Sequence, residues 1–378
     1  MVGNPVVELT PIPPEKLAEA LRGSHPELEG VREAAEDPVY LVGGAVRDLL
    51  LGRGRSDIDL AVVGDAGGLA ARLGAKTVEH ERFATAKVEL DGHEVDIATA
   101  RTETYPSPGA LPAVEPAGSI EADLGRRDFT INAMAVPLSG EAGLIDPHGG
   151  RADLENGLLR VLHARSFEDD PTRAIRAARY AARLGLRLED ETEALLRAAD
   201  LETVSADRRE AELLRLAGEP TAPEAYRLLD EWGLVALREG GVELARRVGE
   251  LLELPLWQLH AERNRAVHEA AMGEPGGERA LADGDPSQPS EAVALATAYS
   301  AVEIVLARAG GADWLDDYLE KWSEVELEIG GDDLIAAGIE EGRAVGRGLA
   351  EAKRSKLDGE ISGREEELAA ALAAAREA

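Results

Sequence analysis

The first third of the chain alternates short apolar runs with polar turns, a pattern typical of strands and helices packed in layers. Val39–Val42 is an apolar run that predicts a strand, and Gly43–Gly44 forms a turn after it. Ala45–Leu51 has the spacing of a short helix that Gly52 would stop. Asp57–Val63 (DIDLAVV) predicts a second strand. This stretch therefore predicts a strand, a helix and a strand in close succession.

The same alternation continues to about Leu162. Lys87–Leu90 and Glu94–Ala98 predict a hairpin that turns at Asp91–Gly92. The segment Thr104–Ala117 (TYPSPGALPAVEPA) is rich in Pro and Gly and is expected to be a loop. TINAMA, residues 130–135, is expected to be a helix. The pattern thus predicts an N-terminal head that contains both strands and helices.

Helical periodicity dominates the rest of the chain. Residues 1–37 are expected to be a helical extension, with Pro13–Pro14 opening a helix around Glu15–Arg22. From Pro171 onward Leu, Ala, Arg and Glu recur at helical spacing, and no strand is predicted. Breaks are expected at three places, of which the second is the best linker candidate: Gly218–Pro223, Gly273–Pro289 and Gly330–Gly331.

Composition narrows the class of protein. The 378 residues are 44% hydrophobic, which is enough for a packed core of more than one unit. No apolar run approaches membrane-spanning length, and the N-terminus lacks the pattern of a secretory signal. Cysteine is absent, which excludes disulfides and thiolate metal sites within this chain. A cytoplasmic protein with no membrane partner is expected.

The charge is strongly acidic, with 73 Asp and Glu against 41 Lys and Arg, a net of −32. Taken alone this disfavours a nucleic-acid partner, because binding RNA requires cations that neutralise phosphates. The stretch from Arg126 to Arg187, however, holds 10 Arg against 8 acidic residues. An anionic ligand would bind most favourably there. An acidic surface suited to solubility or to high salt would explain the excess of acidic residues in the rest of the chain.

Two carboxylates lie two residues apart on a predicted strand, Asp57 and Asp59, so that both point to the same face. Paired carboxylates repel each other unless a cation lies between them, and Mg²⁺ prefers carboxylate and phosphate oxygens. If the Glu94–Ala98 strand lies beside the first, Asp96 becomes a third ligand. Three carboxylates could hold two metal ions for attack at phosphorus. Solvated acids at a strand end, or on a hairpin surface, are the alternative.

Gly43–Gly44 ends a strand and opens a helix, where exposed backbone N–H groups favour phosphate. Arg47, one turn into the helix, adds positive charge. Alone, a Gly-Gly turn or a pair of aspartates is weak evidence. Together, the features form an ordered series between Val39 and Val63: a strand, the Gly-Gly turn, a helix, a loop and a strand with the two aspartates. This order favours a metal–nucleotide site.

Several segments resemble the ordered signatures of one family. LVGGAVRDLLLGRGRSDIDLAV is similar to the first signature of the class II tRNA nucleotidyltransferases and bacterial poly(A) polymerases, within the DNA polymerase β-like superfamily. Four later segments resemble further signatures of this family: RRDFTINAMA, LIDPHGGRADLENGLLRVL, DDPTRAIRAARYAARLG and VSADRREAELLRL. The segment GGDDLIAAGIEEGRAVGRGLAEAKRSKLDGEIS resembles the family's C-terminal RNA-binding tail. Departures are Asp169 where the family usually has Glu, and Arg343 where a Pro is common. Residues 236–329 match no signature.

The resemblance implies an α+β fold, with a mixed-sheet nucleotidyltransferase head followed by an all-helical neck, body and tail. The implied boundaries are a helical extension over 1–37, the head over 38–163, a base-recognising neck over 164–236, a body over 237–329 and an RNA-binding tail over 330–378. No His-Asp metal motif of an appended phosphohydrolase domain is present.

The resemblance also implies a set of site residues. The catalytic, metal-binding residues would be Asp57, Asp59 and Asp96. The nucleotide would be bound by Gly43, Gly44, Arg47, Arg127, Asp128, Asn132, Asp170, Arg173 and Arg176. RNA would be bound by Arg179, Arg183, Lys353 and Arg354. For the Arg127–Asp128 pair, a helix cap is an alternative, and for Asp170, Arg173 and Arg176 an Arg-rich solvated face is another.

The implied reaction is template-independent addition of CMP and/or AMP to the 3′ end of tRNA, from CTP and ATP, with two Mg²⁺ ions. A partial enzyme that adds only CC or only A is an alternative, as is a poly(A) polymerase. A non-catalytic RNA-binding homologue is disfavoured by the intact carboxylates. The sequence leaves the added nucleotides and the oligomeric state open.

Overall fold

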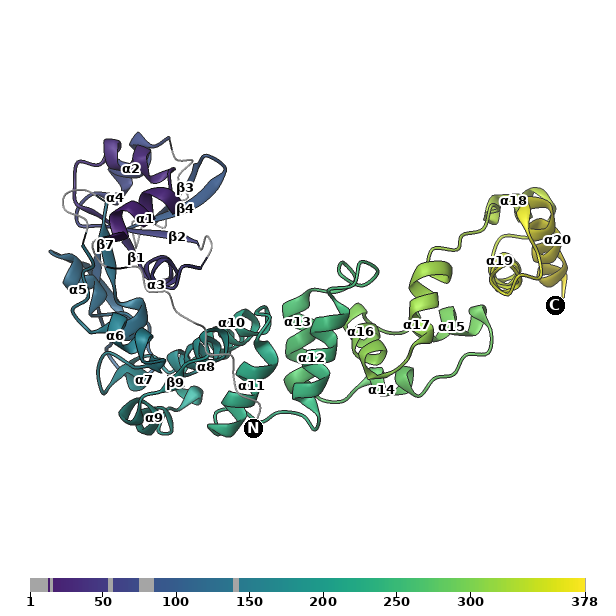
Figure 1. The fold of residues 1–378 in the computed structure, drawn as a ribbon. Coiled ribbons are helices and arrows are strands. Elements are labelled where there is room, and N and C mark those ends of the chain that lie inside the picture. The colour runs from purple at the N-terminus through teal and green to yellow at the C-terminus, as the bar shows by residue number, and fades with distance from the viewer. Residues whose placement is uncertain (1–12, 14–15, 54–56, 75–84, 139–142, 378) are drawn as a thin grey trace. The chain divides into compact units, whose positions relative to one another are not determined.

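The computed structural model describes residues 13, 16–53, 57–74, 85–138 and 143–377. The chain divides into two compact units, Met1–Val235 and Ala236–Ala378. The first unit is built around a five-stranded mixed sheet, and the second is helical throughout its described residues (Figure 1). A mixed sheet followed by helices is the α+β fold that the sequence predicts.

The sheet has the strand order β3-β4-β2-β1-β7. Its strands are β1 (Val39–Val42), β2 (Ile58–Val62), β3 (Thr85–Leu90), β4 (His93–Thr99) and β7 (Ala135–Pro137). Strands β2 and β4 are parallel, and the other neighbouring pairs are antiparallel. Because β2 lies in the middle of the sheet, both of its edges are paired, and its register is fixed from two sides.

Alternation along β2 and β4 separates an apolar face from a polar one. Ile58 and Leu60 on β2 and Val95 and Ile97 on β4 are buried, so the residues between them point to the opposite face. The predicted β3–β4 hairpin is confirmed, and Asp91 has a φ of 50° at its turn. The apolar alternation therefore forms the core and leaves the acidic residues of both strands on one open face.

Short helices and a second hairpin surround the sheet. These elements are α1 (Leu17–Ser24), α2 (Leu28–Ala34), α3 (Gly44–Leu50), α4 (Ala66–Arg72), α5 (Ile120–Leu124), α6 (Gly150–Glu155) and the hairpin of β5 (Arg101–Thr104) and β6 (Ala113–Pro116). The predicted start of the first helix at Glu15 and the loop residues 54–56 lie outside the described residues. The helix over Glu15–Arg22 is thus seen only from Leu17 onward.

The remainder of the first unit is mainly helical. It comprises α7 (Ser166–Asp169), α8 (Thr172–Leu184), α9 (Asp190–Leu196), the 3-10 turn η3 (Leu201–Thr203), α10 (Ala206–Ala217) and α11 (Ala222–Glu231). Helix α8 packs against α10 and α11. On α8, Ala174, Ile175, Ala177 and Ala178 are buried. The small alanine side chains let α8 approach its neighbours closely. The helix that bears the arginines is therefore firmly packed.

The second unit contains α12 (Gly241–Leu251), α13 (Arg263–Met272), α14 (Gly277–Ala282), α15 (Pro289–Ala296), α16 (Ala301–Gly310), α17 (Trp314–Asp317), the π-helical turn η4 (Tyr318–Trp322), α18 (Gly331–Ala336), α19 (Arg343–Leu357) and α20 (Gly363–Arg376). The last three helices share an apolar cluster that includes Leu334, Ala352 and Ala371. Asp358 at the end of α19 accepts from the backbone and hydroxyl of Ser290, which ties this cluster to α15.

Four expectations from the sequence are wrong. Gly273–Pro289 is not a linker, because it contains α14, whose Leu281 is fully buried. Residues 130–135 form only a 3-10 turn, η2 (Thr130–Asn132), because Ala135 begins β7 and adds to the sheet beside β1. The loop Thr104–Ala117 includes β6, which pairs with β5. A strand does follow Pro171: β9 (Arg187–Leu188) pairs with β8 (Leu158–Leu159).

Candidate functional site

Three aspartates gather on the open face of the sheet. Asp59 on β2 and Asp96 on β4 are direct partners in the parallel ladder, and Asp57 immediately precedes β2. The expected adjacency of the two strands is therefore confirmed. Loss of surrounding water raises the pKa of the Asp59 carboxyl. The Arg127 charge lowers this pKa, whereas the carboxylates of Asp96 and Asp57 raise it further. The three acids thus form one field of negative charge that a cation would relieve.

The chemistry of these carboxylates suits a divalent cation, although the protein does not form a complete cage. Among the residues that the structure describes, no group of three or more His, Asp or Glu side chains stands ready to hold a metal ion. No described side chain donates a hydrogen bond to Oδ1 of Asp96, and Nζ of Lys87 lies 3.5 Å from it. Mg²⁺ is commonly held by one or two carboxylates together with water and substrate phosphates. The pair of Asp59 and Asp96 fits that mode of binding.

Gly43 lies where a side chain has no room. Its φ is +69°, and a Cβ atom there would meet Nη1 of Arg127 at 2.9 Å and Oδ2 of Asp59 at 3.7 Å. Only glycine combines this conformation with this approach. Gly44 begins α3, so this turn opens the helix next to the strand that carries Asp59. The predicted Gly-Gly turn is confirmed, and its role with phosphate stays a prediction.

A buried polar network joins α3, the η2 turn and α8. Asp128 accepts from Nε and Nη2 of Arg176 at 2.9 and 2.6 Å, and its other oxygen accepts from the amide of Asn132 at 3.0 Å. Nη1 of Arg47 donates to Oδ1 of Asn132 at 2.6 Å, and its other nitrogens donate to Asp48. Arg47 is buried and already paired, so it holds this network in place rather than offering a free charge.

The charge state of Asp128 follows from this network. Burial alone would raise the pKa of its carboxyl, but the charge of Arg176 and the hydrogen bonds from Asn132 and Arg176 hold it at about 2. The guanidinium of Arg176 also lies over the ring of Tyr180, 5.7 Å from its centroid. Asp128 is thus ionised at neutral pH. Each member of the ion pair has a further contact that holds it, Asp128 with Asn132 and Arg176 with Tyr180.

Asp170 and Arg173 stand at the junction of α7 and α8 and have separate partners. Oδ1 of Asp170 accepts from the backbone and hydroxyl of Thr172 and from Nη2 of Arg208 at 3.1 Å. Nη2 of Arg173 donates to the carbonyl of Arg126 at 2.9 Å, while its guanidinium lies 5.9 Å from the ring of Tyr105. The backbone N–H of Arg173 donates to the carbonyl of Asp170 at 3.1 Å, but the two side chains do not pair with each other. Both side chains line the smaller of the two cavities at this site.

Two cavities meet at this site. One, of about 270 Å³, is lined by Gly43, Gly44, Asp59, Glu103, Tyr105, Arg126, Arg127, Asp128, Asn132, Asp170, Arg173, Arg176 and Tyr180. The other, of about 640 Å³, is lined by His25, Glu27, Gly44, Arg47, Asp48, Asp57, Ile58, Asp59, His93, Glu94, Arg179, Tyr180 and Arg183. Gly44, Asp59 and Tyr180 belong to both. Asp59 therefore lies where two occupants would meet, whereas Asp57 lines only the larger cavity and Asp96, beside Asp59 in the sheet, lines neither.

The structure separates the predicted RNA-binding residues into two groups. Arg179 and Arg183 line the larger cavity. The guanidinium of Arg179 lies over the ring of Tyr180, and Arg183 is 3.7 Å from Asp48. Lys353 and Arg354 lie on α19 of the second unit. Lys353 is exposed, whereas Arg354 already has ion pairs with Glu351, Asp358 and Glu360.

Sequence reasoning missed several residues of the site. Glu103, Tyr105, Arg126 and Tyr180 all line the smaller cavity. Arg208 supports Asp170. Tyr105 belongs to the segment Thr104–Ala117, for which the sequence predicts a loop, and Glu103 directly precedes that segment. Their polar side chains on either side of Thr104 are the local signal that could have found them.

Comparison with known proteins identifies the family of this chain. Residues 39–160 match the model of the poly A polymerase head domain. The chain is 35% identical over 350 residues to the CC-adding tRNA nucleotidyltransferase of Deinococcus radiodurans, which covers 89% of each chain. The chain belongs to the tRNA nucleotidyltransferase and poly(A) polymerase family.

Other members of this family are similar over different lengths. The A-adding tRNA nucleotidyltransferase of Geobacter sulfurreducens is 47% identical over 180 residues, which is 46% of this chain but only 20% of that protein. The Thermotoga maritima CCA-adding enzyme complexed with tRNA is a structural match with a TM-score of 0.67 at 30% identity, covering 95% of this chain and 98% of that one. The family and the α+β fold inferred from the sequence motifs are thus confirmed.

No described helix of this family member is both long and apolar enough to cross a membrane. The predicted division of the chain into five domains stays a prediction. So do the individual roles of the site residues.

Proposed function

We propose that this protein is an RNA nucleotidyltransferase that adds CMP and/or AMP to the 3′ end of tRNA without a nucleic-acid template, releasing pyrophosphate. The observation that carries the proposal is the position of Asp59, beside Asp96, at the junction of two cavities. A nucleotide in the smaller cavity and an RNA end in the larger one would meet at these carboxylates. The relatives that bear CC-adding and CCA-adding names support this assignment.

In this mechanism the RNA 3′ hydroxyl attacks the α-phosphate of the bound nucleotide, and pyrophosphate leaves. When bound, Mg²⁺ supplies charge for the developing oxyanions and lowers the pKa of the attacking hydroxyl. Asp57, Asp59 and Asp96 would hold it. The backbone N–H groups at Gly43 and Gly44, at the turn that opens α3, would bind phosphate oxygens. The close approach of Gly43 to Asp59 supports this role.

The remaining residues of the smaller cavity would bind the sugar and the base. Arg127, which approaches Gly43 closely, and the Asp128–Asn132 pair would bind the ribose and phosphates. Asp170, between α7 and α8, would bind the base together with Arg173 and Arg176 from the first turns of α8. Arg176 acts through Asp128, to which it is already bonded.

The RNA would be bound by cations of both units. Arg179 and Arg183 of α8 line the cavity that would hold the RNA end. Lys353 and Arg354 lie on the tail helix α19, and Lys353 is the more exposed of the two. Because phosphate contacts give affinity without reading sequence, these residues would position the RNA and leave the choice of nucleotide to the first unit.

Incubation of tRNA transcripts with each nucleotide separately tests the proposal. Transcripts that end before, within and after the CC sequence are given CTP, ATP, UTP or GTP, and product length is measured. We expect extension with CTP, with ATP or with both, and none with UTP or GTP. Extension of CC-ended RNA by one A alone would identify an A-adding enzyme, and a long tail would identify a poly(A) polymerase. Failure to extend any transcript contradicts the proposal.

The geometry of Asp170 allows a sharp test of base selection. Thr172 and Arg208 both donate to Oδ1, and no described residue donates to Oδ2. Cytosine and adenine present an amino donor beside a ring-nitrogen acceptor, which suits a carboxylate oxygen beside a guanidinium. Asp170→Asn keeps the acceptor for Arg208 and replaces the free acceptor by a donor. Discrimination against UTP and GTP should fall by about 1–3 kcal/mol.

The measurement is kcat/KM for all four nucleotides in the wild type, Asp170→Asn and Arg173→Ala. Arg165→Ala is the matched control, because Arg165 is an exposed arginine at the start of α7. It should leave the ratios unchanged. An equal loss for all four nucleotides in the Asp170 and Arg173 variants would instead assign both residues to packing.

A further inference from the structure

The hairpin β5–β6 is held at its base and at its tip. At the base, the backbone N–H of Arg101 donates to Asp123 at 3.0 Å. At the tip, the N–H of Gly109 donates to the carbonyl of Glu168, and its carbonyl accepts from Nη1 of Arg208 at 2.8 Å. A Cβ atom on Gly109 would lie 2.5 Å from the carbonyl oxygen of Thr203. The hairpin is therefore firmly docked on the helices that carry Asp170.

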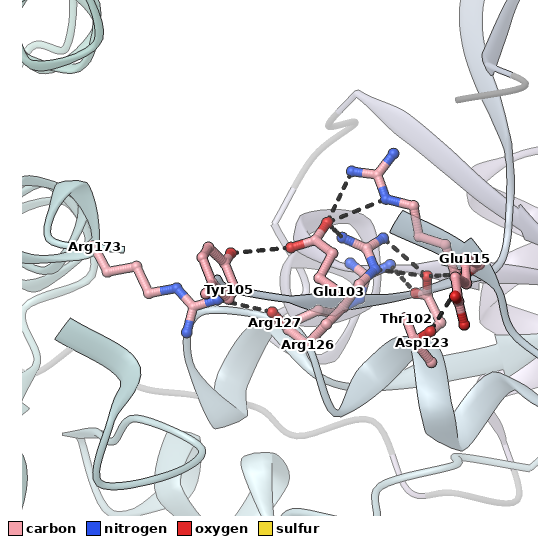
Figure 2. Close-up of polar contacts among 9 residues, drawn as sticks. Thr102, Glu103, Tyr105, Glu115, Asp123, Arg126, Arg127 and Arg173 are labelled. Carbon is pink, nitrogen blue, oxygen red and sulfur yellow. Dashed lines mark hydrogen bonds and ion pairs between the residues drawn. The ribbon is translucent and has the colours of Figure 1, made fainter. Parts of the chain in front are cut away.

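Within this hairpin Glu103 is the anchor. Its side chain is 8% exposed and accepts from Nη1 of Arg126 at 3.0 Å and from Nε of Arg101 at 3.2 Å (Figure 2). The hydroxyl of Tyr105 donates to its second oxygen at 3.1 Å. Arg126 is itself fixed by two hydrogen bonds to Asp123. A carboxylate bound by two arginines has little freedom to move, so it fixes the phenol that it accepts from.

Tyr105 connects this anchor to the base-reading side of the cavity. Its ring faces Arg173, whose guanidinium carbon lies 5.9 Å from the ring centroid, within the range of a cation–π contact (Figure 2). Burial raises the pKa of Tyr105 to about 12, so the hydroxyl keeps its proton and remains a donor to Glu103. The ring is thus held at one end by a hydrogen bond and presents its face to the guanidinium.

Arg173 is an unusual buried cation. It is 4% exposed, and no described carboxylate forms an ion pair with it. Its Nη2 donates to the carbonyl of Arg126, while no described group accepts from its buried Nη1. Because a buried cation without compensation is costly, the ring of Tyr105 and this carbonyl are its main stabilising contacts. Arg173 lines the smaller cavity, and its Nη1 is a donor to which no described group is bonded.

We propose that Tyr105, fixed by Glu103, is a positioning residue that holds the guanidinium of Arg173 in the orientation in which it reads the nucleotide base. This inference rests on the proposed function. The choice of an aromatic partner has a physical reason. A carboxylate would bind the N–H edge of Arg173 and compete with the base, whereas a ring contacts the guanidinium at its face and leaves the edge free. Selectivity then depends on a residue that acts through Arg173.

Two variants separate the contribution of the Tyr105 ring from those of its hydroxyl and its side-chain volume, and a third variant is a control. Tyr105→Phe keeps the aromatic face and loses the hydrogen bond to Glu103. Tyr105→Leu keeps a large apolar side chain and loses the aromatic face. Thr102→Val on the same strand is the control, because Thr102 bonds only the facing strand at Glu115 and lies outside the cavity (Figure 2). Thermal melting of each variant checks that the fold is retained.

The readout is the ratio of kcat/KM for the preferred nucleotide to that for UTP and GTP, together with the Kd of each nucleotide measured by equilibrium binding. Tyr105→Leu should lower the ratio on the order of tenfold, with KM for tRNA unchanged. Tyr105→Phe should lower it less, and Thr102→Val should leave it unchanged. A ratio retained in the folded Tyr105→Leu variant, or an equal loss for all four nucleotides, would overturn the inference.

These outcomes are distinguishable from failure of the proposed function. If the wild type extends no RNA, the proposed activity is wrong, and the nucleotide Kd values alone judge the role of Tyr105. Selective binding that is lost in Tyr105→Leu and kept in Tyr105→Phe still supports it. Binding with unchanged selectivity, or without selectivity in the wild type, overturns it.

Discussion

Asp59→Asn is expected to lower kcat for nucleotide transfer by roughly a hundredfold or more while the protein stays folded. The substitution removes a negative oxygen from the face on which Asp59 and Asp96 lie side by side. Loss of a ligand that fixes charge at a phosphoryl-transfer site costs about 3 kcal/mol or more of transition-state stabilisation. Single-turnover transfer to tRNA in Mg²⁺ measures the effect. Asp91→Asn, at the turn of the neighbouring hairpin, is the matched control and should retain full activity.

The same variant should be at least as stable as the wild type. The pKa of Asp59 is raised in the folded protein, so its contribution to stability is present at low pH and is lost as pH rises through the folded value. At neutral pH the ionised carboxylate therefore disfavours folding, and asparagine removes that effect. Thermal melting at pH 7 should show an equal or higher midpoint. Near-normal kcat, or a large drop in the melting midpoint, would contradict the assignment of Asp59 to the chemistry.

Arg176→Met is expected to lower the free energy of unfolding by about 3–5 kcal/mol. The variant keeps an unbranched apolar side chain but leaves the buried Asp128 carboxylate without the two N–H groups that donate to its Oδ2. Removing one member of a buried pair costs more than the pair itself contributes, because the remaining charge is uncompensated. Urea unfolding at pH 7 measures the loss. Arg187→Met, an exposed arginine of the same unit, should change stability by less than about 0.5 kcal/mol.

The pH dependence of this loss has a definite sign. The pKa of Asp128 is lowered to about 2, so the stability that its pairing supplies is present above the ordinary value of about 3.9 and is lost between that pH and 2. The gap between wild type and Arg176→Met should therefore narrow below pH 4. Adding Asp128→Asn to the variant should recover part of the lost stability at pH 7. A gap that is constant with pH would mean that the loss comes from packing.

Local patterns predicted where the aspartates of the sheet lie. Period-two alternation placed Asp57 and Asp59 on one face, and the Asp91–Gly92 turn signal placed the hairpin that carries Asp96. That Asp96 lies directly beside Asp59 is a matter of which strands pair, and the parallel β2–β4 pairing joins residues 37 positions apart. Nothing local to either strand determines that pairing, so the sequence could state it only as a condition.

Residues that act through others were not predictable in this way. Arg47 follows a Gly-Gly turn and was expected to offer charge, but Asp48 and Asn132 occupy its guanidinium. The bond to Asn132 spans 85 positions. Tyr105 gains its role only because the tip of its hairpin docks on the helices beyond position 165. Periodicity describes one helix or strand at a time, whereas these roles arise where side chains from three elements contact one another.

All of the side chains that line the smaller cavity lie between Gly43 and Tyr180, within the first unit. The second unit contributes none of them. On the proposed assignment of this cavity to the nucleotide, a change in the choice of C or A would arise by substitution within the first unit, and the second unit would be free to diverge separately. Enzymes with different nucleotide preferences could then descend from a shared head without a new fold, through a few altered side chains around Asp170 and Arg173.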